Sequence, residues 1–165
     1  MLHGKLYLLL LSPEIPDFTR FISELCSKEA AGETKDYDGL LLRIQEGQRW
    51  RFRIRGNTTH SKSEEEGKRG KVYPHVSVKY KREWLMKKAP ACGFALDDEL
   101  FEITHTDQLK FMRGEKGAPV VLTVAVFEGV LRITDVELFR KALVQGIGRA
   151  KAYGCGLLTI SGIKM

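Results

Sequence analysis

Near its C-terminus the chain reads Gly146-Ile-Gly148-Arg149-Ala-Lys151-Ala-Tyr153-Gly154-Cys-Gly156-Leu-Leu, two Gly-x-Gly pairs with two cations between them. Glycine is the residue that takes positive φ without steric strain and that lets another backbone approach closely. The pattern therefore specifies a backbone path through this segment. Because the cations sit among the glycines, the segment is suited to holding a phosphate chain.

The neighbours of this segment distinguish it from the common nucleotide-binding loops. A dinucleotide fingerprint or a P-loop follows a strand and opens a helix. Here a helical pattern, residues 135–145, comes first, and an apolar strand, residues 157–160, follows. A nucleotide-binding enzyme is therefore disfavoured. On the motif alone, a phosphate-binding loop and a plain helix-to-strand connection with solvated cations stay equally open.

Upstream, residues 49–55 alternate strictly between apolar and basic side chains, which predicts a strand. Trp50, Phe52 and Ile54 share one face. The other face carries Arg49, Arg51, Arg53 and Arg55. Same-face residues of a strand are about 6.6 to 7 Å apart, a spacing that fits a phosphate backbone better than a small anion. The alternatives are a solvated strand face or arginines paired with acids from elsewhere.

The positive charge of the chain is unevenly placed. The net charge is +6 and the sequence pI is about 9.3. Between Arg43 and Lys88 there are fourteen Lys and Arg residues against five Asp and Glu. Such clustering indicates a polyanionic partner, although charge alone does not separate RNA from DNA or from an acidic protein.

The pattern of elements predicts an α+β protein with tandem ferredoxin-like domains. The first domain, residues 1–60, spells only βαβ, with a strand at Leu6–Leu11 and a helix from Pro16 to about Cys26. Residues 61–70 form a polar linker. The second domain, residues 71–165, spells a complete βαββαβ. Its predicted elements are a strand at 71–75, a helix at 77–88 with Lys79, Lys81, Arg82, Lys87 and Lys88 on its polar side, hairpin strands at 100–111 and 120–133, a helix at 135–145 capped by Asp135, and a strand at 156–160.

Cysteine and histidine usage argues against a metal centre. Cys26, Cys92 and Cys155 form no CxxC pair, so we expect reduced thiols in a cytoplasmic protein. Four histidines are scattered along the chain: His3, His60, His75 and His105. The sequence therefore predicts no metal and no cofactor. No stretch approaches the roughly 20 apolar residues of a membrane span.

The C-terminal glycine segment closely resembles the signature of the CasE branch of CRISPR repeat endoribonucleases, in the glycine-rich-loop RAMP superfamily. The resemblance extends to Val126-Phe127-Glu128-Gly129-Val-Leu-Arg-Ile-Thr and to Gln48-Arg-Trp-Arg-Phe-Arg-Ile-Arg-Gly-Asn57. It implies binding of a CRISPR repeat hairpin and one metal-independent cut at its 3′ base. In that cut a ribose 2′-hydroxyl attacks its own phosphate and leaves a 2′,3′-cyclic phosphate. It also implies partner subunits of a type I-E surveillance complex around the crRNA, and no membrane.

The resemblance assigns RNA contacts to the loop, to the basic strand and to the following linker. These residues are Arg51, Arg53, Arg55, Lys68, Arg69, Lys71, Gly146, Gly148, Arg149, Lys151, Gly154 and Gly156. Tyr153 either stacks on a base or packs in the core. The catalytic histidine of the family lies in the first helix of its first domain, which we expect upstream of Met1, so the catalytic residues stay unknown. The alternative is a non-catalytic RNA-binding or scaffold subunit.

An incomplete first domain also has a physical consequence. A strand at Leu6–Leu11 would have too few partners to cover its edges. We therefore expect unusual exposure of this run, or its pairing with another chain.

Overall fold

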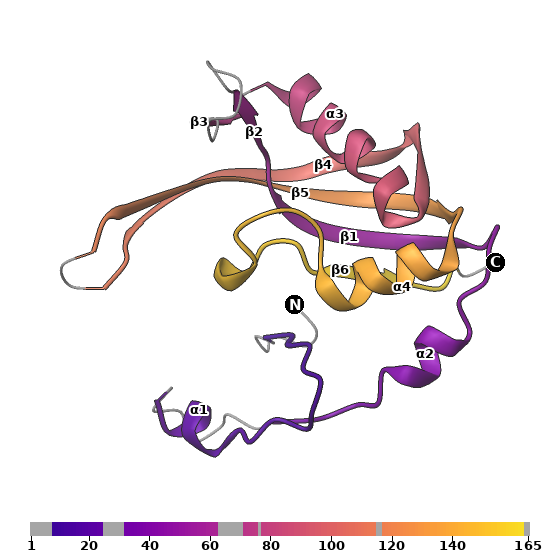
Figure 1. Ribbon diagram of the computed structural model, residues 1–165, viewed down its shortest axis with the longest axis horizontal. Helices are drawn as coiled ribbons and strands as arrows, with labels where there is room; N and C mark the ends of the chain where they lie inside the picture. The colour runs from indigo at the N-terminus through magenta and orange to yellow at the C-terminus, as the bar shows by residue number, and fades with distance from the viewer. Residues whose placement is uncertain (1–7, 25–31, 63–70, 76, 115–116, 164–165) are drawn as a thin grey trace. The chain divides into compact units, whose positions relative to one another are not determined.

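The computed structural model describes residues 8–24, 32–62, 71–75, 77–114 and 117–163. The chain divides into two compact units between Arg43 and Ile44. Figure 1 shows the elements of both units with their labels. In the described residues no helix is long and apolar enough to cross a membrane.

The first unit holds two short helices, α1 (Thr19–Glu24) and α2 (Asp38–Leu42). Asp17 precedes α1, and its carboxylate accepts a hydrogen bond from the Thr19 N–H at 2.9 Å. The predicted strand at Leu6–Leu11 is not formed in its described part, residues 8–11. Leu8 exposes 66% of its surface, and Leu9, Leu10 and Leu11 are exposed as well, as predicted for this part of the run; residues 6 and 7 lie outside the described residues.

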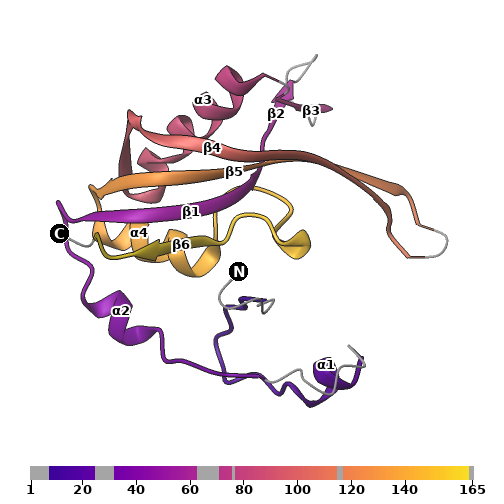
Figure 2. The same cartoon turned by 180° about the vertical axis from the view of Figure 1, so that it is seen from behind.

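The second unit is built on a four-stranded antiparallel sheet of order β4-β5-β1-β6. Its strands are β1 (Arg49–Asn57), β4 (Phe94–Met112), β5 (Pro119–Ile133) and β6 (Leu158–Ser161). Helix α3 (Val78–Lys88) joins β1 to β4, and α4 (Val136–Gln145) joins β5 to β6. This is the βαββαβ order of a ferredoxin-like fold. Figures 1 and 2 show both helices on the same face of the sheet.

The place of β1 corrects the predicted domain boundaries. β1 pairs with β5 from Arg49 opposite Arg132 to Asn57 opposite Val124, and it also pairs with β6. It is therefore the first strand of the ferredoxin-like unit, a role that was predicted for residues 71–75. β1 is an interior strand because it pairs along both edges, and its Phe52 and Ile54 side chains are buried in the core. The chain divides at residues 43 and 44, and not within residues 61–70.

The segment predicted as a linker and first strand is an insertion between β1 and α3. Strand β2 (Thr59–Lys62) pairs with β3 (Lys71–Pro74) in a separate two-stranded antiparallel sheet. Residues 63–70 lie outside the described residues. The His75 N–H then donates to the Thr58 carbonyl at 2.9 Å, which returns the chain to the end of β1 before α3 begins.

The two helices begin at side-chain caps and bury their apolar faces on the sheet. Asp135 caps α4 as predicted, accepting from the Leu138 N–H at 2.9 Å. Ser77 caps α3 by accepting from the Tyr80 N–H. From α3, the Trp84 ring stacks on Phe127 of β5 with ring centroids 6.0 Å apart. A Cβ on Gly56 of β1 would lie 2.7 Å from that indole, so β1 needs a glycine at this position.

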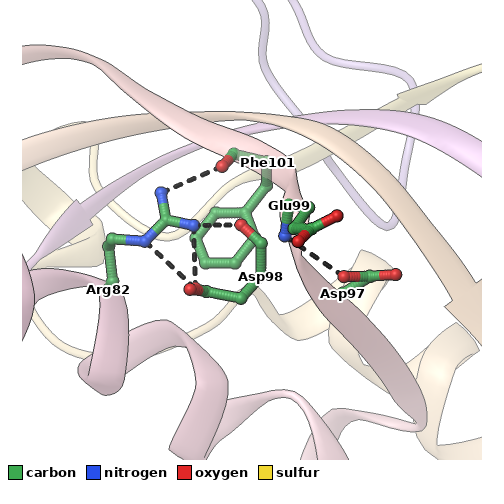
Figure 3. Close-up of polar contacts among 5 residues, drawn as sticks. All are labelled: Arg82, Asp97, Asp98, Glu99 and Phe101. Atoms are coloured by element: carbon green, nitrogen blue, oxygen red, sulfur yellow. Dashed lines mark hydrogen bonds and ion pairs between the residues drawn. The ribbon is translucent and has the colours of Figure 1, made fainter.

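Two basic residues of α3 were predicted to face solvent, but the structure covers most of their surface. Lys81 is buried, with 7% of its surface exposed. Arg82 is largely covered and fastens α3 to the irregular part of β4, where the register shifts between Leu96 and Phe101 (Figure 3). Its guanidinium pairs with the Asp98 carboxylate at 2.8 Å, donates to the carbonyls of Asp98 and Phe101, and lies 4.1 Å from the centre of the Phe101 ring.

Replacing Arg82 by alanine removes all of these interactions at once. We expect Arg82→Ala to lower the free energy of unfolding by about 2 to 3 kcal/mol, since hydrogen bonds to charged groups are among the stronger ones. Urea denaturation followed by tryptophan fluorescence measures this change. The matched control is Lys79→Ala, an exposed cation of the same helix, expected to stay within about 0.5 kcal/mol. Equal losses in the two variants would contradict the role given to Arg82.

Candidate nucleic-acid interface

The loop between α4 and β6 adopts the backbone that its glycines predict. Gly146, Gly148, Gly154 and Gly156 all have positive φ, between 71° and 89°. Ala150 also lies in the left-handed region, with φ of 65°. The short 3₁₀ helix η2 (Lys151–Tyr153) follows Ala150. The prediction that these glycines specify a backbone path is confirmed.

The base of the loop is closed by two backbone hydrogen bonds. The Ile147 N–H donates to the Gly156 carbonyl at 2.8 Å, and the Gly156 N–H donates to the Arg55 carbonyl at 2.7 Å. A Cβ on Gly156 would lie 2.5 Å from the Ile147 carbonyl oxygen, so the two ends of the loop meet only because Gly156 has no side chain. The loop is thereby tied to β1 beside Arg55.

Each side of the loop is held by a different part of the unit. On one side, a Cβ on Gly148 would lie 2.9 Å from the Trp84 indole of α3. On the other side, Cys155 is buried against Leu122 and Val124 of β5, and Tyr153 packs on the same cluster. The Tyr153 ring also meets Phe111 of β4 edge-on, with centroids 5.1 Å apart. Of the two interpretations of Tyr153, the structure therefore supports packing.

The arginines of β1 lie on the face of the sheet that the helices leave open. Phe52 and Ile54 are buried, whereas Arg49, Arg51 and Arg53 are exposed and Arg55 is half-buried. Because successive side chains of a strand point to opposite faces, the four arginines lie away from α3 and α4. Arg51 and Arg53 line a shallow depression together with residues of β4, β5 and β6.

One of these arginines already has an acidic partner. Arg53 pairs with Glu128, its neighbour on β5, at 3.0 Å, and both side chains are substantially exposed. The alternative of arginines paired with acids thus holds for this position. An exposed ion pair contributes at most about 1 kcal/mol, so a phosphate can displace Glu128 at little cost.

The two cations of the loop are exposed, and their surroundings fix where the loop lies. Arg149 and Lys151 both reach solvent. Burial raises the pKa of the Cys155 thiol, and the charge of Arg55 opposes that rise, which shows that Arg55 lies near the loop. Burial likewise raises the pKa of Cys92, in the 3₁₀ helix η1 (Pro90–Cys92), against the charges of Lys88 and Lys151. The positive charges of the loop therefore lie between the arginines of β1 and the C-terminal end of α3.

The remaining predicted contacts are only partly described. Lys68 and Arg69 lie outside the described residues. Lys71 opens β3, and the register places it opposite Lys62 of β2. Within the described ranges, no group of three or more His, Cys, Asp or Glu residues could hold a metal ion. His105 is exposed on β4, opposite Val126.

One grouping of side chains was not predicted from the sequence. His60 of β2 and His75 bring their ring centroids to 4.7 Å, and Tyr73 and Tyr80 extend the row on either side. The histidines are fifteen positions apart and looked scattered. Nothing in the sequence pattern signals this grouping, because it depends on the register of β2 on β3, which places His60 opposite Tyr73.

The two glycines at the end of the loop allow a matched test of its closure. Gly154 and Gly156 share the left-handed backbone, but a Cβ on Gly154 would meet nothing within 4 Å. We expect Gly154→Ala to cost about 1 to 2 kcal/mol from backbone strain alone. Gly156→Ala also pushes against the Ile147 carbonyl, and we expect it to lose at least about 2 kcal/mol more. Urea denaturation of both variants measures the difference; equal losses would mean that the loop is not closed at this point.

Comparison with known proteins agrees with this geometry. A family model described as "CRISPR associated protein" matches residues 2–161. The CRISPR-associated endoribonuclease Cse3 of Thermus thermophilus is 30% identical, over 72% of this chain and 58% of that protein. The chain therefore spans a little under three fifths of the length of this relative.

Two solved structures share the fold at appreciable sequence identity. Thermus thermophilus Cse3, bound to an RNA representing a pre-cleavage complex, is 28% identical with a TM-score of 0.63, over 72% of this chain and 56% of that chain. A chain of a CRISPR RNA-guided surveillance complex is 25% identical with a TM-score of 0.61, over 83% of this chain and 69% of that chain. On the extent of the family match and the identity to Cse3, this chain belongs to the family of CRISPR-associated proteins.

Proposed function

We propose that this chain binds the hairpin of a CRISPR repeat transcript and forms the RNA-gripping part of a metal-independent endoribonuclease. One observation carries the proposal: the hydrogen bond from the Gly156 N–H to the Arg55 carbonyl holds the glycine loop beside the strand that carries the arginines. The proposal is supported by the likeness to an endoribonuclease whose structure contains RNA.

Double-stranded RNA offers a protein mainly its shape, its phosphates and its 2′-hydroxyls. Arg51 and Arg55 present guanidiniums along one strand, and Arg149 and Lys151 add charge from the loop. These groups position the RNA without reading its bases, because phosphate contacts carry no sequence information. Of the four loop glycines, Gly154 is the one with open space where a side chain would stand, so a phosphate can approach the loop backbone closely at that position. On this proposal, Lys68, Arg69 and Lys71 also contact the RNA.

The proposed cut needs no metal because the RNA supplies its own nucleophile. The 2′-hydroxyl gives its proton to a base as its oxygen forms a bond to the adjacent phosphorus. The bond between phosphorus and the 5′-oxygen breaks, and the leaving oxygen takes up a proton from an acid. The products are a 2′,3′-cyclic phosphate and a free 5′-hydroxyl. Cations near the phosphate stabilise the charge that develops in the transition state. We assign this stabilisation to the loop cations, and the acid and base to the first domain of the family.

A second candidate is an RNA-binding subunit that holds crRNA without cutting it. The likeness to a chain of an RNA-guided surveillance complex favours this candidate. On either candidate, we propose that the chain associates with other subunits of such a complex in the cytoplasm. The two functions share the RNA surface and differ only in whether the bond is broken.

Incubation of a repeat hairpin with the protein in EDTA, followed by a denaturing gel, separates the candidates. A single cut at the 3′ base that leaves a cyclic phosphate supports the endoribonuclease. A hairpin with a 2′-deoxy residue at that position should bind equally and stay intact, because its nucleophile is missing. Tight binding without a cut favours the second candidate, and binding no tighter than that of random RNA of the same length would overturn both.

The loop cations predict a specific decrease in salt dependence. We expect the double variant Arg149→Ala, Lys151→Ala to bind the hairpin more weakly and to flatten the plot of log K against log salt concentration. The slope falls by about 0.7 to 0.9 for each phosphate that the protein no longer neutralises. Filter binding at several KCl concentrations measures it. Lys141→Ala, an exposed cation of α4, is the control expected to keep the slope; an unchanged slope in the double variant would remove the loop from the interface.

A further inference from the structure

Four aromatic rings form a row between the small β2–β3 sheet and the start of α3. The order is Tyr73, His60, His75 and Tyr80, with successive centroids 5.8, 4.7 and 6.0 Å apart. The planes of neighbouring rings differ by only 27° to 33°. Neighbouring rings are therefore closer to parallel than to edge-on.

The row is fixed in place by the backbone on which its members sit. His60 and Tyr73 are directly opposite in the β2–β3 register. The His75 N–H donates to the Thr58 carbonyl, and the Tyr80 N–H donates to the Ser77 hydroxyl at the start of α3. Three separate segments thus present their rings in a defined order. Such preorganisation limits the conformational entropy that a ligand must remove on binding.

At one end of the row, the Tyr80 ring is exposed to solvent. Tyr80 exposes 53% of its surface, and within the described part of the chain no further ring stacks on it. A core-packing role does not explain this exposure, since Tyr80 is not among the buried aromatic residues of the unit. The Tyr80 ring thus offers an apolar, planar surface to solvent at the end of a ready-made stack.

The charges around the row suit a nucleic acid. Lys79 precedes Tyr80 and is exposed. Burial, followed by the charges of His60 and Lys87, lowers the pKa of His75, while Glu83 opposes the shift. The lowered pKa favours the neutral form of His75, which can stack without carrying a charge into the row. The flanking positive charge comes from lysines, and these attract phosphate at any pH near neutrality.

We propose that the Tyr73, His60, His75 and Tyr80 row is a stacking platform for an unpaired base of the bound RNA, with the base on Tyr80. This inference rests on the proposed function, because it adds a contact to the same RNA. Single-stranded bases are recognised by stacking on aromatic side chains, and every base has a face that can stack. The expected ligand is a hairpin that carries a single-stranded extension.

The test compares a blunt hairpin with the same hairpin carrying an unpaired extension on either end. We expect the extension on one end to tighten binding by about tenfold, within the range of one stacked base. In Tyr80→Leu this advantage should shrink to less than about threefold, whereas in Tyr80→Phe it should persist. Thermal melts of all three proteins show whether the folded state is intact. Val78→Ala, at an exposed position in the same turn of α3, is the control.

A second measurement observes the stack directly. Stacking quenches the fluorescence of 2-aminopurine, so this base placed in the extension should be quenched by the unchanged protein and by Tyr80→Phe, and not by Tyr80→Leu. If Tyr80→Leu lowers the melting temperature but keeps the quenching and the advantage of the extension, the row is only a joint between β3 and α3 and the proposal fails. Failure to bind even the blunt hairpin would instead overturn the proposed function.

Discussion

The structure depends on the position of β1 between β5 and β6. One face of this strand supplies Phe52 and Ile54 to the core, and the other carries the arginines. Its end supplies the carbonyl of Arg55 that holds the glycine loop. Because side chains of a strand alternate between faces, a slip of one residue would bury the arginines and expose the core residues. The register of β1 therefore fixes the fold and the basic surface together.

The glycine loop turns this sheet into a candidate RNA surface because it is held from several sides at once. Trp84 of α3, the Arg55 carbonyl and the cluster around Leu122 each contact a different part of it. A segment with four glycines has much conformational freedom when unfolded, and fixing it is entropically unfavourable. These contacts offset that entropic cost. The loop can therefore present its cations from a defined backbone instead of a flexible one.

The sequence alone was sufficient to predict those features of the structure that depend on interactions between neighbouring residues. The Asp135 cap, the alternation of Trp50 through Arg55 and the positive φ of the loop glycines each depend on a few neighbouring residues. It was not sufficient for β1, whose partners on β5 and β6 lie about seventy or more positions further along the chain. The burial of Arg82 depends on the irregular stretch of β4, and the ring row depends on the register of β2 and β3. No periodicity in the sequence reports such contacts.

Trp84 lies against two glycines from distant parts of the chain. A side chain on either Gly56 or Gly148 would enter the space that the indole fills. Trp84, Gly56 and Gly148 therefore share one packed volume, and a larger side chain at one of these positions requires a smaller one at another. In related sequences, we expect a smaller residue in place of the tryptophan to accompany any larger residue in place of these glycines, so the trio should be inherited as a single covarying set.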